Sequence, residues 1–280
     1  MNTNDILIGT MTAYHGADAL SGQLAQIREN EMNACQLNVS GAGVYSEEEA
    51  RRVHDIIDRS GVKITAVWAG WDGPAEWNFT GGPSTLGIVP PAYRDVRVRQ
   101  IKNAADFAYK IGVSDVITHV GFIPEDMHDE KYVGTVCALR ELSRYLGARG
   151  QYFLFETGQE TPVAMLRCIE DIGEPNLGVN FDTANLILYG KANSADAAMI
   201  LGKYIRNTHI KDGFYPTNGR ELGREVALGE GLCNFPAVAS SLAKCGYKGP
   251  YIIEREISGD QQNTDILRAR DIIISALREI

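Results

Sequence analysis

The sequence has few cysteines, no long apolar run and no excess of basic residues. Its cysteines are odd in number and form no CxxC pair, which argues against a disulfide framework and a thiolate metal site. We expect reduced thiols, mostly small apolar filler of a cytoplasmic protein, at positions 35, 137, 168, 233 and 245. No stretch approaches the roughly 18 apolar residues of a membrane span. No basic segment precedes an apolar run near the start, so no secretory signal is expected.

Acidic residues outnumber basic ones by 36 to 27, which gives a formal net charge of −9. This balance argues against nucleic acid and against an anionic membrane surface as partners. The composition is otherwise that of an ordinary globular protein, with 44% hydrophobic and 22% charged residues. Disordered, collagen-like and membrane classes are therefore excluded.

Short β-rich runs recur along the chain, with helical patterns between them. Several are continuous apolar runs, as expected for parallel strands buried on both faces. The predicted strands are Ile6–Thr10, Cys35–Val39, Ile64–Ala69, Val116–Val120, Tyr152–Glu156, Leu177–Asp182, Ile205–Ile210 and Tyr251–Glu254. Ser46 and Glu49 predict a helix start with a capping box, and Thr161-Pro162 predicts another start. An apolar stripe predicts a last helix over about 263–278.

Eight β/α units in one chain close most simply into a (β/α)8 TIM barrel, an α/β fold that we expect to span residues 1–280 as a single domain. The alternative is a doubly wound open sheet, which the absence of GxGxxG after the first strand disfavours. Long loops follow the third and seventh strands, Gly70–Pro91 and Asp212–Phe235. Both lie on the face where barrel active sites are built, so both are candidate substrate covers.

Chemically useful side chains stand where five predicted strands end: His119, Glu156, Asp182, His209 and Glu254. The run before Glu156 is Tyr-Phe-Leu-Phe, so this carboxylate follows a buried strand. An unpaired charge there would cost several kcal/mol, roughly. A barrel brings the carboxyl ends of its strands together at one mouth, so these groups need a common partner. A divalent cation is the simplest common partner for these groups.

The predicted ligand set is Glu156, Asp182, His209 and Glu254. Three carboxylates and one imidazole suit Mn²⁺ or Mg²⁺, with Co²⁺ or Zn²⁺ as alternatives; this is not the thiolate or three-histidine set of structural or hydrolytic zinc. Such ions take about six ligands, which leaves two positions for adjacent oxygens of a sugar. The alternative is a structural ion-pair network with Lys211 and Arg255 as partners.

The motifs at successive strand ends resemble those of the xylose-isomerase-like barrel superfamily, in the branch with ketose 3-epimerases and inosose dehydratases. These motifs are ETGQE, NFDTAN, HIKDG, LGEG and IERE, and the resemblance covers nearly the whole chain. It implies that the same four residues bind one divalent metal and that Glu156 and Glu254 also act as catalytic acid and base on opposite faces of the substrate. It also implies a homo-oligomer, either a dimer or a tetramer.

The implied activity is that of a metal-dependent isomerase or epimerase acting on a small-molecule sugar. Moving a proton at a carbon next to a carbonyl forms an enediolate, which a metal stabilises as a Lewis acid. Return of the proton from the opposite face inverts the centre, and return to the neighbouring carbon isomerises the sugar. Because coordination weakens a carboxylate as a base, a second carboxylate oxygen must stay free near the substrate.

One position departs from the epimerase pattern, because Asn185 stands where those enzymes usually carry a histidine. Asparagine forms hydrogen bonds but carries no proton or charge. A dehydratase that acts on an inosose or keto-sugar at the same site is therefore an alternative. The superfamily's abasic-site endonucleases need a further histidine where this chain has Asn185, and an Asp-Arg-His run where it has Gly223-Arg224-Glu225, which argues against a nuclease. A non-catalytic sugar-binding barrel is a third alternative, against which two inward glutamates argue.

The candidate substrate-binding residues are His119, Asn185, Lys211, Arg224 and Trp68. Each has a simpler interpretation as well. His119 could be only a hydrogen-bonded residue of the barrel mouth, Lys211 could pair with a ligand carboxylate, and Arg224 could form a loop salt bridge. The tryptophan ring suits the C–H face of a sugar, but could instead seal a subunit contact.

Overall fold

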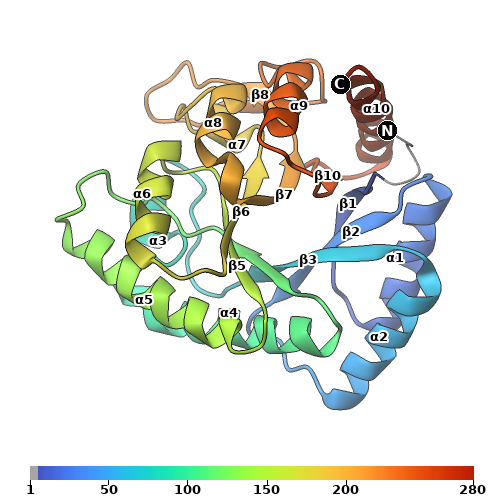
Figure 1. Cartoon of the computed structure of the whole chain (residues 1–280), viewed down its shortest axis with the longest axis horizontal. Coiled ribbons are helices and arrows are strands. Elements are labelled where there is room, and N and C mark those ends of the chain that lie inside the picture. Colours follow the sequence, from blue (N-terminus) through green and yellow to red (C-terminus); the bar gives the residue numbers. More distant parts are fainter. Residues whose placement is uncertain (1–5) are drawn as a thin grey trace.

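The computed structural model describes residues 6–280 and has a closed barrel of parallel strands surrounded by helices (Figure 1). The strands follow the order β1-β10-β7-β6-β5-β4-β3-β2 around the barrel, so β1 pairs with both β2 and β10. Their bounds are β1 Ile8–Ala13, β2 Ala34–Ser40, β3 Lys63–Gly70, β4 Asp115–Thr118, β5 Tyr152–Glu156, β6 Leu177–Asp182, β7 Ile205–Ile210 and β10 Tyr251–Ile253. The TIM barrel prediction is confirmed.

Helices follow the strands and cover the outside of the barrel. The longer ones are α1 Ala17–Glu29, α2 Glu47–Ser60, α4 Pro91–Lys110, α5 Glu130–Gly147, α6 Pro162–Ile172, α8 Ser194–Leu201, α9 Phe235–Lys244 and α10 Asp260–Arg278. The connection after β3 contains the short helix α3 (Gly82–Thr85), and β6 is followed by the short helix α7 (Asn185–Leu188). After β7 the chain forms a small antiparallel hairpin of β8 (Asp212–Phe214) and β9 (Arg224–Val226) before α9. Among the described residues no helix is long and apolar enough to cross a membrane.

Strands β5, β6 and β7 begin and end where the sequence predicts, but β4 ends at Thr118, before the predicted Val120. The reason is that the Val120 carbonyl accepts hydrogen bonds from the backbone of Ile88 (2.7 Å) and Val89 (3.1 Å), which belong to the connection after β3. The first strand begins at Ile8 rather than Ile6 and continues to Ala13.

The predicted helix caps are present, with one difference. Ser46 Oγ accepts the Glu49 N–H (3.1 Å), and Thr161 Oγ1 accepts the Ala164 N–H (3.2 Å) at a helix that begins with Pro162. The capping box prediction is wrong in its second half, because the Glu49 carboxylate accepts the Ala17 N–H (3.0 Å) instead of returning to Ser46. Glu49 therefore ties the start of α2 to the first turn of α1, which has no side-chain cap of its own.

The inside of the barrel is apolar on one side and polar on the other. Buried Ala66, Ile117 and Leu154 pack together from β3, β4 and β5. On the other side, the Gln36 Nε2 donates to Asn180 Oδ1 (3.0 Å) and to Asn207 Oδ1 (2.8 Å). Buried polar groups need such partners, so this network gives β2, β6 and β7 a defined mutual position directly below the ends of the strands.

Arg97 of α4 holds the connection between β3 and α4 in place. Its guanidinium is buried and donates to the carbonyls of Thr85 (2.6 Å), Gly87 (2.7 Å) and Pro74 (2.7 Å). The same group lies over the Trp71 ring, 3.9 Å from its centroid. Arg97 thus holds three separate carbonyls of this connection, which the hydrogen bonds from Ile88 and Val89 to Val120 also anchor.

We expect Arg97→Lys to lower the free energy of unfolding by at least about 3 kcal/mol, because an ammonium cannot reach all of the carbonyls. Arg99→Lys is the matched control, because Arg99 is exposed on the same helix and should change stability by no more than about 0.5 kcal/mol. The measurement is urea unfolding of the three proteins. Equal stability of the two variants would contradict a structural role for Arg97.

Candidate metal centre

Four of the polar residues at the strand ends meet at one point of the barrel mouth. Glu156 ends β5, Asp182 ends β6, His209 lies in β7 and Glu254 follows β10. Each offers one ligand atom, and these atoms all lie within 4.8 Å of one another. The four strands are consecutive neighbours in the barrel, and Asp182 lies directly opposite His209 in the sheet. This cluster could hold a metal ion.

The His209 ring lies in the middle of the cluster. Its Nδ1 donates to Glu156 Oε1 (2.8 Å) and lies 3.3 Å from Glu254 Oε2 and 3.8 Å from Asp182 Oδ2. Its Nε2 donates to Gln36 Oε1 (2.6 Å) on the far side of the ring. A ligating histidine needs a hydrogen-bond acceptor on its other nitrogen, and Gln36 supplies one, so Nδ1 is the atom left for a metal.

The charges in the cluster depend strongly on one another. Burial alone would lower the pKa of His209, but the Glu254 and Glu156 carboxylates raise it well above its usual value. Burial would raise the pKa of Glu254, but Lys211 and His209 hold it well below its usual range. Burial raises the pKa of Asp182 to about 7, although Lys211 opposes this. The cluster therefore contains more negative charge than its own cations offset.

The hydrogen bonds of the Asp182 carboxylate show whether a cation fits the cluster. Its Oδ1 accepts the backbone N–H groups of Ala184 (2.8 Å) and Asn185 (2.7 Å), which fixes the carboxylate against the first residues of α7. Its Oδ2 is buried and has no hydrogen-bond partner among the described residues. The Lys211 ammonium lies 3.3 Å from this oxygen and the His209 Nδ1 lies 3.8 Å from it, so Oδ2 has charged neighbours but no hydrogen bond within residues 6–280, which is costly for a buried carboxylate oxygen. The residues present therefore fit a divalent cation.

A cavity of about 290 Å³ opens above the cluster. Glu156 and Glu254 form part of its wall, whereas Asp182 and His209 do not. The predicted substrate-binding residues in the wall are Trp68, His119 and Asn185. The Trp68 Nε1 donates to Glu156 Oε2, so this ring both lines the cavity and orients a carboxylate.

Two of the predicted substrate-binding residues do not line this cavity. Lys211 is fully buried, and its Nζ binds Glu256 Oε1 (2.8 Å), Glu254 Oε2 (2.9 Å) and Asp182 Oδ2 (3.3 Å). Three carboxylates thus hold the ammonium, which corresponds to the simpler interpretation given above. Arg224 is exposed on β9 and its guanidinium lies over the Phe214 ring, 5.2 Å from the centroid. The hairpin carries it away from the cavity, and from this connection it is Leu222 that reaches the wall.

Gln159 and Tyr189 are among the residues of the cavity wall that were not singled out from the sequence. Gln159 is 1% exposed, and neither its Nε2 nor its Oε1 has a hydrogen-bond partner of good geometry among residues 6–280. The hydroxyl of Tyr189, which is 5% exposed, lacks one as well, although the Gln159 side chain lies near enough to oppose the rise that burial causes in its pKa. Gln159 lies within ETGQE, so its place beside Glu156 was visible, but nothing in the sequence shows that its amide is unpaired. Gln36 was also missed; the signal was a polar residue between Cys35 and Leu37 in a strand that is otherwise largely apolar.

His119 has the third unpaired group of the wall. Its Nε2 lies 3.5 Å from Glu156 Oε1, and its Nδ1 is buried without a partner in the described part of the chain. Burial lowers the pKa of His119, so the ring is neutral near pH 7. Trp77 packs edge-on against this ring, with 5.0 Å between centroids, and is itself part of the wall. The connection held by Arg97 therefore contributes to the cavity.

Comparisons with known proteins agree with this architecture. The xylose isomerase-like TIM barrel family matches residues 24–276. A crystal structure of a xylose isomerase domain protein from Planctomyces limnophilus has 31% sequence identity and a TM-score of 0.90, and the match covers 98% of each chain. An L-ribulose 3-epimerase has 19% identity and a TM-score of 0.73 over 98% of this chain and 95% of that one. A xylose isomerase-like barrel from Mycobacterium smegmatis, solved with magnesium, has 16% identity and a TM-score of 0.71. The match covers 99% of this chain and 98% of that one.

Fold and site together define a β/α-barrel protein whose mouth has a Glu, Asp, His and Glu cluster that could bind a divalent metal. More specifically, the chain belongs to the xylose isomerase-like TIM barrel family. Solved structures that share this fold include an L-ribulose 3-epimerase and a D-tagatose 3-epimerase-like protein.

We expect Gln36→Met to weaken Mn²⁺ binding by about 10–100-fold, because the His209 Nε2 loses its acceptor and the ring is no longer held with Nδ1 toward the cluster. The measurement is isothermal titration of the metal-free protein with Mn²⁺. Val39→Ala is the control, a buried change on the same strand that should reduce stability without changing the affinity for Mn²⁺. Equal affinities of Gln36→Met and the unaltered protein would show that Gln36 does not orient the ligand.

Proposed function

We propose that this protein is a divalent-metal-dependent isomerase or epimerase that moves a proton at a sugar carbon next to a carbonyl. The observation that carries the proposal is that Glu156 and Glu254 belong to the candidate metal cluster and also line the cavity above it. Asp182 and His209 lie beneath them, out of reach of a substrate. Two of the four residues can therefore serve both a cation and a reacting carbon.

The proposed cation is Mn²⁺ or Mg²⁺, because these ions prefer oxygen ligands and the cluster offers three carboxylates and a single nitrogen. The related barrel from Mycobacterium smegmatis was solved with magnesium. A divalent cation at this place would act as a Lewis acid on the carbonyl and neighbouring hydroxyl oxygens of the substrate. His209 would then bind through a neutral Nδ1 while its Nε2–H stays on Gln36.

The two glutamates would divide the proton transfer between them. Glu156 accepts from His209 at Oε1 and from Trp68 at Oε2, so a proton transfer at Oε2 would have to replace the Trp68 N–H. Glu254 is held at Oε2 by Lys211, and its Oε1 has no hydrogen bond within the described chain, so that oxygen can reach a substrate proton. One carboxylate removes the proton and the other returns it, from the opposite face for epimerisation or to the adjacent carbon for isomerisation.

The rest of the wall would hold the sugar. Unpaired buried polar groups cost about 1–3 kcal/mol each, and substrate hydroxyls would satisfy the amide of Gln159, the hydroxyl of Tyr189 and the Nδ1 of His119. Asn185 adds an amide at the start of α7. The rings of Trp68 and Trp77 offer flat apolar faces to the C–H groups of the sugar.

Dehydration of a keto-sugar at the same site is the second candidate, and Asn185 is the observation that favours it. Asn185 lines the cavity, and its amide cannot take up or release a proton. Proton removal next to a carbonyl would then be followed by loss of a hydroxyl instead of return of the proton. The homo-oligomer and the cytoplasmic location stay predictions.

The test is NMR in D₂O with ketoses, ketose phosphates, oxidised sugars and inososes, with added Mn²⁺ and again after chelation. We expect metal-dependent deuterium incorporation next to the carbonyl, and a dehydratase would also give a product that has lost water. Glu254→Gln should lower the exchange rate by about 10²–10⁴-fold, because the amide cannot accept the proton. Glu256→Gln is the matched control, because Glu256 also lines the cavity and binds Lys211 but lies outside the cluster, so the comparison isolates the role of a cluster carboxylate.

The proposal fails if no compound exchanges in the presence of metal. It also fails if Glu254→Gln reduces substrate binding as much as turnover, because the barrel would then be a binding protein. A loss in Glu256→Gln as large as that in Glu254→Gln would remove the special role of the cluster.

We expect Gln159→Met to raise KM by about tenfold, because the variant cannot hydrogen-bond a substrate hydroxyl, while its shape is nearly conserved. Gln151→Met is the control, since Gln151 is equally buried at the opposite end of β5 and donates to Ala105. That variant should lose stability and leave KM unchanged. Steady-state kinetics with the exchanging sugar checks both, and an unchanged KM in Gln159→Met would exclude contact with the substrate.

A further inference from the structure

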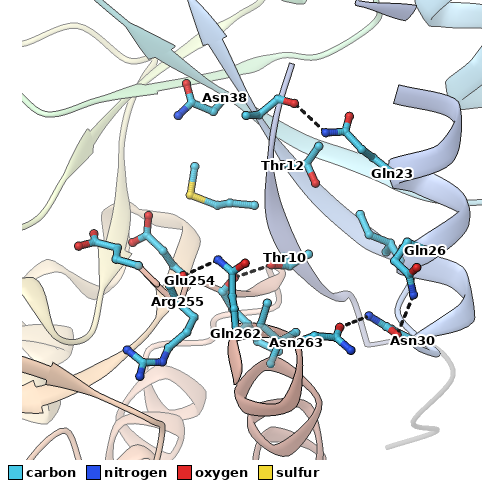
Figure 2. Close-up of a pocket in the computed structure, with 16 residues that line it drawn as sticks. Thr10, Thr12, Gln23, Gln26, Asn30, Asn38, Glu254, Arg255, Gln262 and Asn263 are labelled. Atoms are coloured by element: carbon cyan, nitrogen blue, oxygen red, sulfur yellow. Dashed lines mark hydrogen bonds between the residues drawn. The ribbon is translucent and has the colours of Figure 1, made fainter. Parts of the chain in front are cut away.

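A second cavity, of about 380 Å³, lies beside the first, between β1, α1 and α10 (Figure 2). The two cavities share four wall residues: Met11, Asn38, Glu254 and Glu256. In Figure 2, Asn38 and Glu254 mark the end toward the barrel mouth, and the opposite end lies between the two helices at Asn30 and Asn263. A molecule whose reacting part lies above Glu254 can therefore extend into this second cavity.

Uncharged polar side chains from both helices line it. Gln23 and Gln26 of α1 and the C-cap residue Asn30 follow at intervals of three and four, so they share one face at this end of the helix. Gln26 Nε2 donates to Asn30 Oδ1 (3.3 Å), and Asn30 Nδ2 donates to Asn263 Oδ1 on α10 (3.1 Å). Gln26 and Asn263 are exposed, and this chain of amides leaves Gln26 Oε1 as an acceptor and Asn263 Nδ2 as a donor for a ligand that replaces solvent there.

Further hydrogen-bonding groups face the same space. Gln262 Nε2 donates to the Arg255 carbonyl (2.8 Å), which leaves its Oε1 as an acceptor. Thr12 contributes a hydroxyl from β1. A sugar hydroxyl is both a donor and an acceptor, so a wall of amides and hydroxyls matches a ring that carries several of them.

The charges of this cavity exclude an anionic ligand. Arg255 is its one cationic wall residue, and its guanidinium is already bound to Asp265 Oδ2 (2.8 Å) and Glu225 Oε1 (2.7 Å). Glu254 and Glu256 stand at the junction with the first cavity and add negative charge. Phosphate recognition needs unpaired basic side chains or clustered N–H donors, and this wall offers carboxylates instead.

We propose that the second cavity is a subsite for a neutral, hydroxyl-rich unit joined to the ring that reacts, so that the substrate is a disaccharide or another glycoside and not a sugar phosphate. This rests on the proposed function, which places the reacting ring above Glu156 and Glu254. The volume of the cavity lies in the range of about 300–1,000 Å³ that is usual for ligand pockets, so it can accept a second ring.

The test is ligand-observed saturation-transfer NMR on the full chain with Mg²⁺. The probes are cellobiose, maltose and trehalose, with methyl glucoside and glucose 6-phosphate for comparison. We expect at least one disaccharide to bind about tenfold more tightly than methyl glucoside, and glucose 6-phosphate to bind no more tightly than methyl glucoside. The proposal is overturned if no disaccharide exceeds methyl glucoside, or if the phosphate binds most tightly.

A pair of variants locates the binding. In Gln26→Leu/Asn263→Leu, we expect the affinity for the disaccharide to fall to that for methyl glucoside, whose own binding stays the same. The control is Ser21→Leu/Thr264→Leu, which changes exposed residues of the same helices outside the cavity and should bind as the unaltered protein does. Equal affinity of both double variants for the disaccharide would place its second ring elsewhere and overturn the proposal.

The outcome separates this proposal from the proposed function, because binding is measured without turnover. Tighter disaccharide binding with no metal-dependent exchange on any sugar would support the subsite and contradict the isomerase or epimerase. Metal-dependent exchange on a free monosaccharide, with no added affinity for any disaccharide, would support the isomerase or epimerase and contradict the subsite.

Discussion

Repulsion between three buried carboxylates is the constraint on which the barrel mouth depends. Glu156, Asp182 and Glu254 converge on one space, and among the described residues His209 and Lys211 bring positive charge to it. Burial, together with the Glu254 and Glu156 carboxylates, raises the pKa of Asp182 to about 7, and the same two carboxylates raise the pKa of His209 well above its usual value. The proton on His209 now offsets part of this negative charge. A divalent cation would bring more positive charge to the same place and could also coordinate a substrate oxygen.

Every group of the cluster is oriented by a residue behind it. Gln36 holds His209, Trp68 holds Glu156, Lys211 holds Glu254, and the backbone N–H groups of Ala184 and Asn185 hold Asp182. Asp182 is therefore held by its own neighbours in the chain, whereas the other three supports lie on different strands or strand ends and depend on the closed barrel. The same holds for the cavity wall, because Trp77 stands on a connection that Arg97 fixes from α4.

The cluster residues that the sequence predicted lie at strand ends, whereas the residues that it missed are recognised only by the hydrogen bonds that they make or lack. Glu156, Asp182, His209 and Glu254 could be predicted because each ends a strand, and the parallel strands of a barrel end at one mouth. Gln159 and Tyr189 could not, because a hydrogen bond that is absent leaves no trace in the order of residues. For Lys211 the sequence left open substrate binding or pairing with a ligand carboxylate, and only the positions of three carboxylates show that it serves them and not the cavity.

The sequence by itself determined the elements with a local cause. Apolar runs made the strands, the caps at Ser46 and Thr161 began two helices, and polar residues at the strand ends marked the mouth. Only the tertiary structure decided where β4 ends, where Arg224 points and which amides meet between α1 and α10. The physical reason is that these features depend on contacts between different segments of the chain. Asn30 and Asn263, for example, are 233 positions apart.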